Sequence, residues 1–172
     1  PLQKGGRTDD FFFLESDGDA ARKLVCDLVT TRLPRSYGFD PIRDIQVLCP
    51  TKLGPTGTQA LNVELQNLLN PEQKGKPQLQ SASRVFRVGD KVMQVRNNYE
   101  IVWNRIGGEQ GVGAYNGDIG IVESINPRDR SMVVRMDDRR LIYPAENLGE
   151  LEIAYAITVH KSQGSEFPAV IL

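Results

Sequence analysis

Several features that would define a function class are scarce in this chain. Its 172 residues contain one histidine and two cysteines, Cys26 and Cys49, which argues against a zinc site built from the usual ligands. Two cysteines are also too few for a disulfide framework, so we expect buried free thiols in a reducing cytoplasm. No apolar run approaches the roughly 20 residues of a transmembrane helix, so no membrane partner is expected.

A phosphate-binding P-loop is also missing, because the pattern G-x-x-x-x-G-K-[ST] occurs nowhere in the chain. The formal net charge of −1 gives no sign of a nucleic-acid binder. The segment from Ser81 to Gly108, however, contains five basic residues and only two acidic ones. A local basic surface is what phosphate binding requires, although solvated charge on a β-rich segment explains the same residues.

What is present in the first part of the chain is an alternation of strand and helix patterns. Buried strands are predicted at Phe11–Leu14 and Ile45–Cys49. One amphipathic helix is predicted from Asp19 to a stop at Pro34, and a second follows the loop 50–58 and ends at Asn70-Pro71. Strand, helix, strand, helix is typical of an α/β layer with parallel strands.

Short strands and tight turns replace this pattern after a polar segment at 71–83, which we predict to be a linker or mobile loop. Strands are expected at 92–95, 119–122, 132–134 and 141–143, with a hairpin loop at the glycine cluster 107–113. Strands spaced by about 8–12 residues are typical of a small antiparallel barrel. We therefore predict an all-β module at 112–149, inserted into an α/β domain formed by 1–111 and 150–172.

The densest group of polar side chains is Thr158-Val-His160-Lys161-Ser-Gln163-Gly164-Ser-Glu166, between two apolar runs. This pattern predicts a strand, a short helix or turn and a second strand. The polar groups then lie at the carboxyl end of the first strand, where open α/β sheets bind ligands. The alternative is an ordinary connection in which Thr158 only caps a helix.

Two further segments carry candidate binding groups. The loop Lys52–Thr58 places a lysine, two glycines and hydroxyls at a helix N-terminus, which attracts an anion such as phosphate. A plain Gly-Pro turn explains the same loop. The stretch Arg96-Asn97-Asn98-Tyr99 combines a cation and amides with an aromatic ring. That combination can hold a sugar-phosphate backbone and stack a base, or can simply form a surface strand and turn.

These segments resemble motifs of RecD-like superfamily-one DNA helicases, the family that includes exodeoxyribonuclease V alpha subunits. Thr158–Phe167 fits the motif V pattern T-x-H-K-x-Q-G-x-E-F in register, and Gln46–Gln66 is similar to motif IV. Asp90–Tyr99 is similar to D-x-V-M-Q-x-x-N-N-Y of that family. Tyr115–Gly120 is similar to Y-N-G-D-x-G, which opens an SH3-like barrel there. The resemblance covers nearly the whole chain.

The resemblance implies a RecA-like second motor domain of the P-loop type, with a parallel sheet and an inserted SH3-like barrel. The parent would be a bacterial, cytoplasmic, ATP-dependent DNA helicase of recombination and repair, moving 5′ to 3′ on single-stranded DNA. Its partners would be a first RecA-like domain and possible subunits of a helicase–nuclease complex, and its cofactors ATP and Mg²⁺. The chain lacks an initial Met and ends inside an apolar run at Leu172, so we expect part of a longer protein. Motif VI would follow Leu172, and this part alone is expected not to hydrolyse ATP.

The resemblance also assigns residues to two ligands. Lys52, Gly164 and Glu166 would face the nucleotide. The residues assigned to DNA are Thr58, Arg96, Asn97, Asn98, Tyr99, Thr158, His160, Lys161 and Gln163. Two other function classes stay open, namely a non-catalytic module that binds nucleic acid or protein through the barrel, and a metabolic α/β enzyme with an anion site at 54–58.

Overall fold

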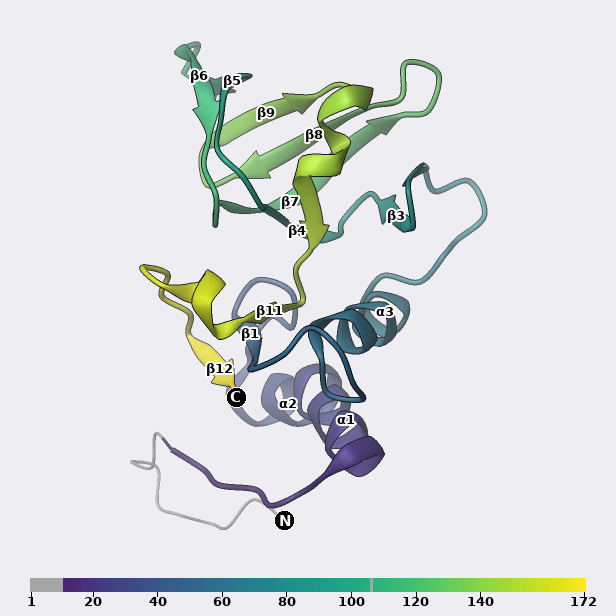
Figure 1. The fold of residues 1–172 in the computed structure, drawn as a ribbon, viewed down its shortest axis with the longest axis vertical. Coiled ribbons are helices and arrows are strands. Elements are labelled where there is room, and N and C mark those ends of the chain that lie inside the picture. The colour runs from purple at the N-terminus through teal and green to yellow at the C-terminus, as the bar shows by residue number, and fades with distance from the viewer. Residues whose placement is uncertain (1–10, 106) are drawn as a thin grey trace.

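Two main β-sheets of opposite type, beside a separate two-stranded pair, organise the computed structural model, which describes residues 11–105 and 107–172 (Figure 1). The smaller sheet is parallel, with the strand order β11-β1-β12. Its strands are β11 (Ala156–Thr158), β1 (Ile45–Cys49) and β12 (Ala169–Ile171). Cys49 lies opposite Thr158, and Ile45 lies opposite Ala169. The end of β11 and the start of β12 therefore lie at opposite ends of β1.

Alternate side chains of β1 determine how the parallel sheet is covered. Ile45, Val47 and Cys49 are buried against α3 (Thr58–Leu69) and a helical segment that precedes the sheet. That segment consists of α1 (Gly18–Asp27), a π-helical stretch (Leu28–Arg32) and α2 (Leu33–Tyr37). Leu48 points to the other face of β1, where it packs with Met93 and Ile157. The predicted strand at 45–49 and the helix ending at Asn70 are thus confirmed.

Two predictions for the N-terminal part are wrong. Residues 11–14 form no strand, and the side chains of Phe11 and Phe13 are each 82% exposed. Pro34 lies inside α2 instead of ending the helix. A proline ring crowds the carbonyl four residues earlier, and the wider π-helical turn before Pro34 accommodates that ring. The helix ends at Gly38, whose φ of 76° is left-handed.

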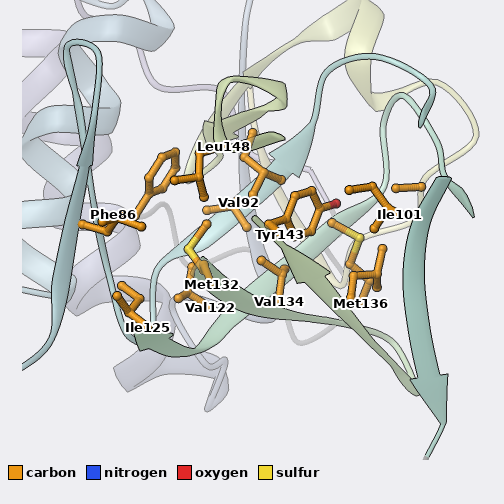
Figure 2. Packing of buried hydrophobic residues seen from close by; sticks show 14 residues of the cluster. Phe86, Val92, Ile101, Val122, Ile125, Met132, Val134, Met136, Tyr143 and Leu148 are labelled. Carbon is orange, nitrogen blue, oxygen red and sulfur yellow. The ribbon is translucent and has the colours of Figure 1, made fainter. Parts of the chain in front are cut away.

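The larger sheet is antiparallel, with seven strands in the order β10-β4-β7-β8-β9-β5-β6. In chain order they are β4 (Lys91–Gln94), β5 (Asn98–Arg105), β6 (Gln110–Ala114), β7 (Ile119–Asn126), β8 (Ser131–Met136), β9 (Arg139–Tyr143) and β10 (Leu151–Ile153). Their inward side chains form one apolar core, in which Val92, Val134 and Tyr143 lie side by side (Figure 2). A 3₁₀ segment (Ala145–Glu150) contributes Leu148 to that core.

The predicted strands at 92–95, 119–122, 132–134 and 141–143 are confirmed, with small shifts of their ends. The segment 71–83 is not only a linker, because β2 (Gln78–Ser81) pairs with β3 (Arg84–Arg87) and brings Phe86 into the antiparallel core. The antiparallel sheet is wider than 112–149, since β4, β5 and β10 also belong to it. None of the helices in the described residues is long and apolar enough to cross a membrane.

We call residues 78–153 the antiparallel module, and residues 18–70 together with 154–172 the parallel module. Buried polar side chains join the two. The Asp90 carboxylate accepts hydrogen bonds from the side chains of Gln66 (2.6 Å), Asn70 (2.6 Å) and Tyr155 (2.9 Å) and from the backbone N–H of Arg87 (2.7 Å). Burial raises the pKa of Asp90, and these donors oppose the rise. A carboxylate of one module is thus fully enclosed by donors that come mainly from the other.

Two amides clamp the link between β10 and β11, where the chain passes from one module to the other. Asn62 of α3 donates from Nδ2 to the carbonyls of Ile153 (2.9 Å) and Ala156 (2.8 Å), and its Oδ1 accepts from the Ala156 N–H (2.8 Å). Gln46 of β1 donates from Nε2 to the Tyr155 carbonyl (3.1 Å). Both residues lie in the segment similar to motif IV, and the structure gives them a role in positioning the start of motif V.

Candidate nucleic-acid interface

Motif V begins at the carboxyl end of β11 and leads to β12 on the other side of β1. Thr158 is half-buried at the end of the strand, opposite Cys49. A single 3₁₀ turn (Val159–Ser162) follows and carries an exposed His160 and a half-buried Lys161. The predicted order of strand, short helix and strand is therefore confirmed. Because the turn is so short, the imidazole and the ammonium group stay close to the sheet edge.

Lys161 connects motif V to the antiparallel module. Its Nζ donates a hydrogen bond to Asn116 Oδ1, in the turn between β6 and β7. The backbone N–H of Asn116 in turn donates to Asn97 Oδ1 at 2.9 Å. Three segments that are far apart in the sequence, at 97, 116 and 161, thus meet at one place. The sequence did not predict this meeting, because it depends on how the two modules are packed together.

An open cavity of about 360 Å³ lies beside this contact. It is lined by Asn116, Gly117, Asp118, His160, Lys161, Gln163, Gly164 and Ser165. The carboxylate of Asp118 accepts from the guanidinium of Arg139 at 3.3 Å, so its charge is compensated by an arginine. The remaining charged side chain on the wall is Lys161. An anion with several acceptor oxygens would find an ammonium and amide donors there.

The segment 96–99 divides into residues that face solvent and one that does not. Arg96, Asn97 and Tyr99 are exposed. Asn98 instead donates from Nδ2 to both carboxylate oxygens of Glu150, at 3.0 and 3.1 Å. Its Oδ1 accepts from the N–H of Glu100 at 2.9 Å, so the whole amide is engaged within the protein. The pattern N-N-Y could not reveal that its two asparagines point in different directions.

Glu150 holds this end of the antiparallel module in place. Burial alone would raise the pKa of Glu150, but hydrogen bonds from Asn98, Gln94 and Asn147 outweigh burial and hold the pKa below its ordinary value. Gln94 completes the arrangement, because its Oε1 accepts from the Tyr143 hydroxyl at 3.0 Å. The exposed residues Arg96 and Asn97 are therefore carried on a rigid support.

The three residues assigned to the nucleotide are not gathered at one place. Lys52 is exposed in the loop after the carboxyl end of β1. Glu166 adjoins Phe167, whose ring lies 5.5 Å from Lys91 Nζ, and that Nζ donates to the Ile45 carbonyl at the opposite end of β1 (3.1 Å). Five residues of extended strand separate these ends by about 13 Å. The sequence predicted the polar groups of motif V at the carboxyl end of the first strand. In the structure, not all of them lie there.

Gly164, which was assigned to the nucleotide, and Thr58, which was assigned to DNA, also lie in surroundings that do not match those ligands. Gly164 has φ of 81° and borders the cavity together with Lys161 and Gln163, which were assigned to DNA. Thr58 is the first residue of α3 and is only 9% exposed. A side chain at Gly57 would overlap the Leu53 carbonyl at 2.5 Å, so this glycine is required for the tight loop. The loop therefore presents Lys52, and not the Thr58 hydroxyl, to solvent.

Lys91 is a residue near motif V that the sequence did not single out. It is 3% exposed, and burial lowers its pKa to about 8 against the opposing influence of Asp40 and Asp44. A buried lysine between β1 and the Phe167 ring fixes the second half of motif V to strand β4. In the sequence, the only sign of a role for Lys91 is its position directly after Asp90 in the D-x-V-M-Q segment.

Two family models match segments of this chain. A family model described as the SH3 domain of ATP-dependent RecD-like DNA helicases matches residues 61–136. A second model, the UvrD-like helicase C-terminal domain, matches residues 153–172, which contain motif V. The chain belongs to the RecD-like DNA helicases. The first match runs from α3 into the antiparallel module as far as β8, and the second covers the end of the parallel module.

Individual RecD-like relatives match most of this chain but only a small part of their own length. The ATP-dependent RecD2 DNA helicase of Deinococcus radiodurans is 34% identical over 127 residues, which is 74% of this chain and 16% of that protein. The RecBCD enzyme subunit RecD of Mycobacterium tuberculosis is 30% identical over 125 residues, covering 73% of this chain and 19% of the subunit. A solved structure of two Pif1 helicases at forked double-stranded DNA aligns with 93% of this chain and 41% of its own, at 20% identity and a TM-score of 0.45.

Proposed function

We propose that this chain is part of an ATP-dependent DNA helicase and binds single-stranded DNA at the cavity between motif V and the Tyr115–Asp118 turn. The observation that carries the proposal is the Lys161–Asn116–Asn97 contact, which joins three motif segments around one open cavity. The names of the relatives, a RecD2 DNA helicase and RecBCD subunits, support the same class.

The proposed DNA contacts follow from exposure and chemistry. Lys161, His160 and Arg96 bind phosphates, and the Thr158 hydroxyl donates to another. The amides of Asn97 and Gln163 complete the surface, and Tyr99 stacks on a base. Two residues assigned to DNA by the resemblance have supporting roles in this proposal: Thr58 is buried, and the Asn98 amide is engaged by Glu150.

In the same proposal the parallel module is the second RecA-like motor domain, and the antiparallel module is an SH3-like barrel inserted into it. The family match over 61–136 supports the second assignment. We locate the module boundaries near Gln78 and Ala154, at the two ends of the antiparallel module, and not at 112 and 149. The insertion then occupies a continuous stretch that leaves and rejoins the parallel module at hydrogen-bonded positions.

Nucleotide contacts belong to the whole protein in this proposal. A first RecA-like domain closes on this module and binds ATP and Mg²⁺ with it. Because Lys52, Gly164 and Glu166 lie apart in this chain, that closure has to bring them to one nucleotide. Residues 158–169 run from one end of β1 to the other, which supports a segment that senses DNA near Thr158 and nucleotide near Glu166. Movement 5′ to 3′ and assembly into a helicase–nuclease complex are further expectations for the whole protein.

ATP turnover by the chain alone tests the division of labour. The 172 residues contain no Walker A lysine, and phosphoryl transfer depends on positioned cations. We therefore expect the wild-type chain and Lys52→Ala to show the same background rate of phosphate release. A rate for the wild-type chain clearly above that of the variant would place catalytic groups within these residues and contradict the proposal.

DNA binding tests the cavity directly. We expect weak binding of an oligothymidylate, with an affinity that falls as salt rises by a log–log slope of about −0.7 per phosphate contact. Lys161→Gln keeps an amide that can donate to Asn116 but removes the charge, so it should weaken binding and make the slope shallower by about 0.7. Lys23→Gln, at an exposed lysine on α1, is the matched control and should leave both quantities unchanged. Binding that is absent, or that ignores salt, would refute the proposed interface.

A further inference from the structure

Two tyrosines form an exposed aromatic pair beside the cavity. Tyr99 lies near the start of β5, and Tyr115 directly follows β6. Their ring centroids are 6.1 Å apart and the rings are inclined by 75°, an edge-to-face arrangement. Tyr99 is 65% exposed and Tyr115 is 46% exposed. Neither ring belongs to the apolar core, so packing within the protein does not explain why two large rings lie here.

The pair is held in position although it faces solvent. Gly113 has φ of 114°, and a Cβ at this position would lie 3.1 Å from the Tyr115 hydroxyl oxygen. The Tyr115 ring therefore lies over the backbone of β6. The backbone N–H of Tyr115 donates a hydrogen bond to the Asp118 carboxylate at 3.1 Å. The Tyr99 hydroxyl accepts from Asn97 Nδ2 at 3.3 Å. Fixed rings lose little conformational entropy when a flat ligand binds.

The surroundings of the pair indicate what kind of ligand fits. Asn116 follows Tyr115 in the chain and joins it to the cavity, because Asn116 contacts both Asn97 and Lys161. A flat, apolar binding surface thus adjoins a cationic, amide-lined cavity. In an edge-to-face pair, the ring that presents its edge keeps both faces clear of the partner ring. A ligand with a flat ring and an attached anion, repeated along a chain, matches these two surfaces.

We propose that Tyr115, together with Tyr99, stacks a nucleobase of single-stranded DNA whose neighbouring phosphate lies in the Lys161 cavity. The inference rests on the proposed function, and it adds Tyr115, which no motif assigned to DNA. A base within a duplex is already stacked on its neighbours, so this platform selects single strands. Because every base has a π-face, it accepts any sequence.

The test compares two single strands with equal numbers of phosphates, an oligothymidylate and an abasic strand. We expect Tyr115→Ala to lower the affinity for the oligothymidylate by at least about fivefold and to leave the affinity for the abasic strand unchanged. Tyr115→Phe keeps the ring and should bind like the wild type. Tyr37→Ala is a matched control, since Tyr37 is a half-exposed ring stacked on Phe39 at 5.8 Å outside this surface.

The outcomes separate this inference from the proposed function. Salt-sensitive binding of both strands, with no effect of Tyr115→Ala on either, would overturn the stacking role and leave the phosphate interface intact. An equal loss on both strands would also overturn it, because the ring would then act on phosphate contacts. A wild-type chain that binds neither strand would refute the proposed function and the stacking role together.

Discussion

The antiparallel and parallel modules differ in what fills their interiors. The antiparallel module has one large apolar core, to which nearly every strand contributes, with Leu141, Tyr143 and Leu148 completely buried. The parallel module has a three-stranded sheet and a smaller core, and polar side chains are buried in both modules, for example Gln46 in the parallel and Gln94 in the antiparallel module. Its main anchors, Asn62 and Gln66, reach the antiparallel module or the link to it. We infer that the antiparallel module is stable by itself and that the parallel module depends on it.

This difference suits the proposed division of labour. A motor domain has to change its contacts as the nucleotide changes, and regions that move are drawn from the less stable parts of a protein. The antiparallel module would then act as the rigid support for Asn97, Tyr99 and Tyr115. Substitutions at matched positions of the two modules test this difference.

The largest effects are expected from truncating matched core leucines, both completely buried. Leu141→Ala in β9 and Leu65→Ala in α3 should each lower the free energy of unfolding by about 2–5 kcal/mol, through lost burial and a cavity. Hydrogen exchange should separate them. Leu141→Ala should speed amide exchange in both modules, and Leu65→Ala only in the parallel module. Faster exchange throughout the molecule in Leu65→Ala would mean that the dependence is mutual.

The next effect concerns the carboxylate between the modules. Asp90→Asn replaces an acceptor by an amide that faces the donors of Gln66, Asn70 and Tyr155. Each buried donor left without a partner costs about 1–3 kcal/mol, partly offset because no charge remains buried, so we expect a loss of about 2–4 kcal/mol in urea unfolding. Asp17→Asn is the control, at an exposed position with no capping hydrogen bond. A loss no larger than that of the control would remove Asp90 as an anchor.

A smaller, pH-dependent effect is expected at Lys91. The pKa of Lys91 is lowered from 10.5 to about 8, so between these values the unfolded state binds more protons than the folded state. The contribution of Lys91 to stability therefore rises with pH across this window, by up to about 3 kcal/mol. Lys91→Met removes the titration, so wild type should gain stability relative to this variant between pH 8 and 10.5. Parallel stability profiles for the two proteins would mean that burial does not lower the pKa of Lys91.

Sequence patterns predicted the elements whose apolar residues repeat regularly. They located β1, α3 and the strands β4, β7, β8 and β9, because periodicity reports which side chains are buried. They missed β5, and β6 covers most of the glycine cluster that was expected to be a hairpin loop. They failed at Phe11–Leu14, where the apolar run is not buried, and at Pro34, where a π-helical turn accommodates the ring. Local patterns report neither tertiary burial nor the width of a helical turn.

The site was predicted as a set of segments but not as an arrangement. Motif V was correctly expected between two strands, yet its contact with Asn116 depends on the packing of two modules. Buried polar residues were also invisible, since Asn62 and Asp90 look like surface residues in a sequence. The inward orientation of Asn98 has the same origin, because its partner Glu150 is 52 residues away.

The smallest effects are expected from one exposed ion pair in each module. Arg22 contacts Glu64 at 3.2 Å between α1 and α3, and Arg84 contacts Glu152 at 3.1 Å between β3 and β10. All four side chains are about one-third exposed, so the pairs are matched in screening. Glu64→Gln and Glu152→Gln should each cost about 0–1 kcal/mol in urea unfolding, and less at high salt. If the modules differ only in their interiors, the two losses should be equal within error. A much larger loss for Glu64→Gln would mean that surface charge also holds the parallel module together, and that buried amides and the Asp90 carboxylate are not its principal support.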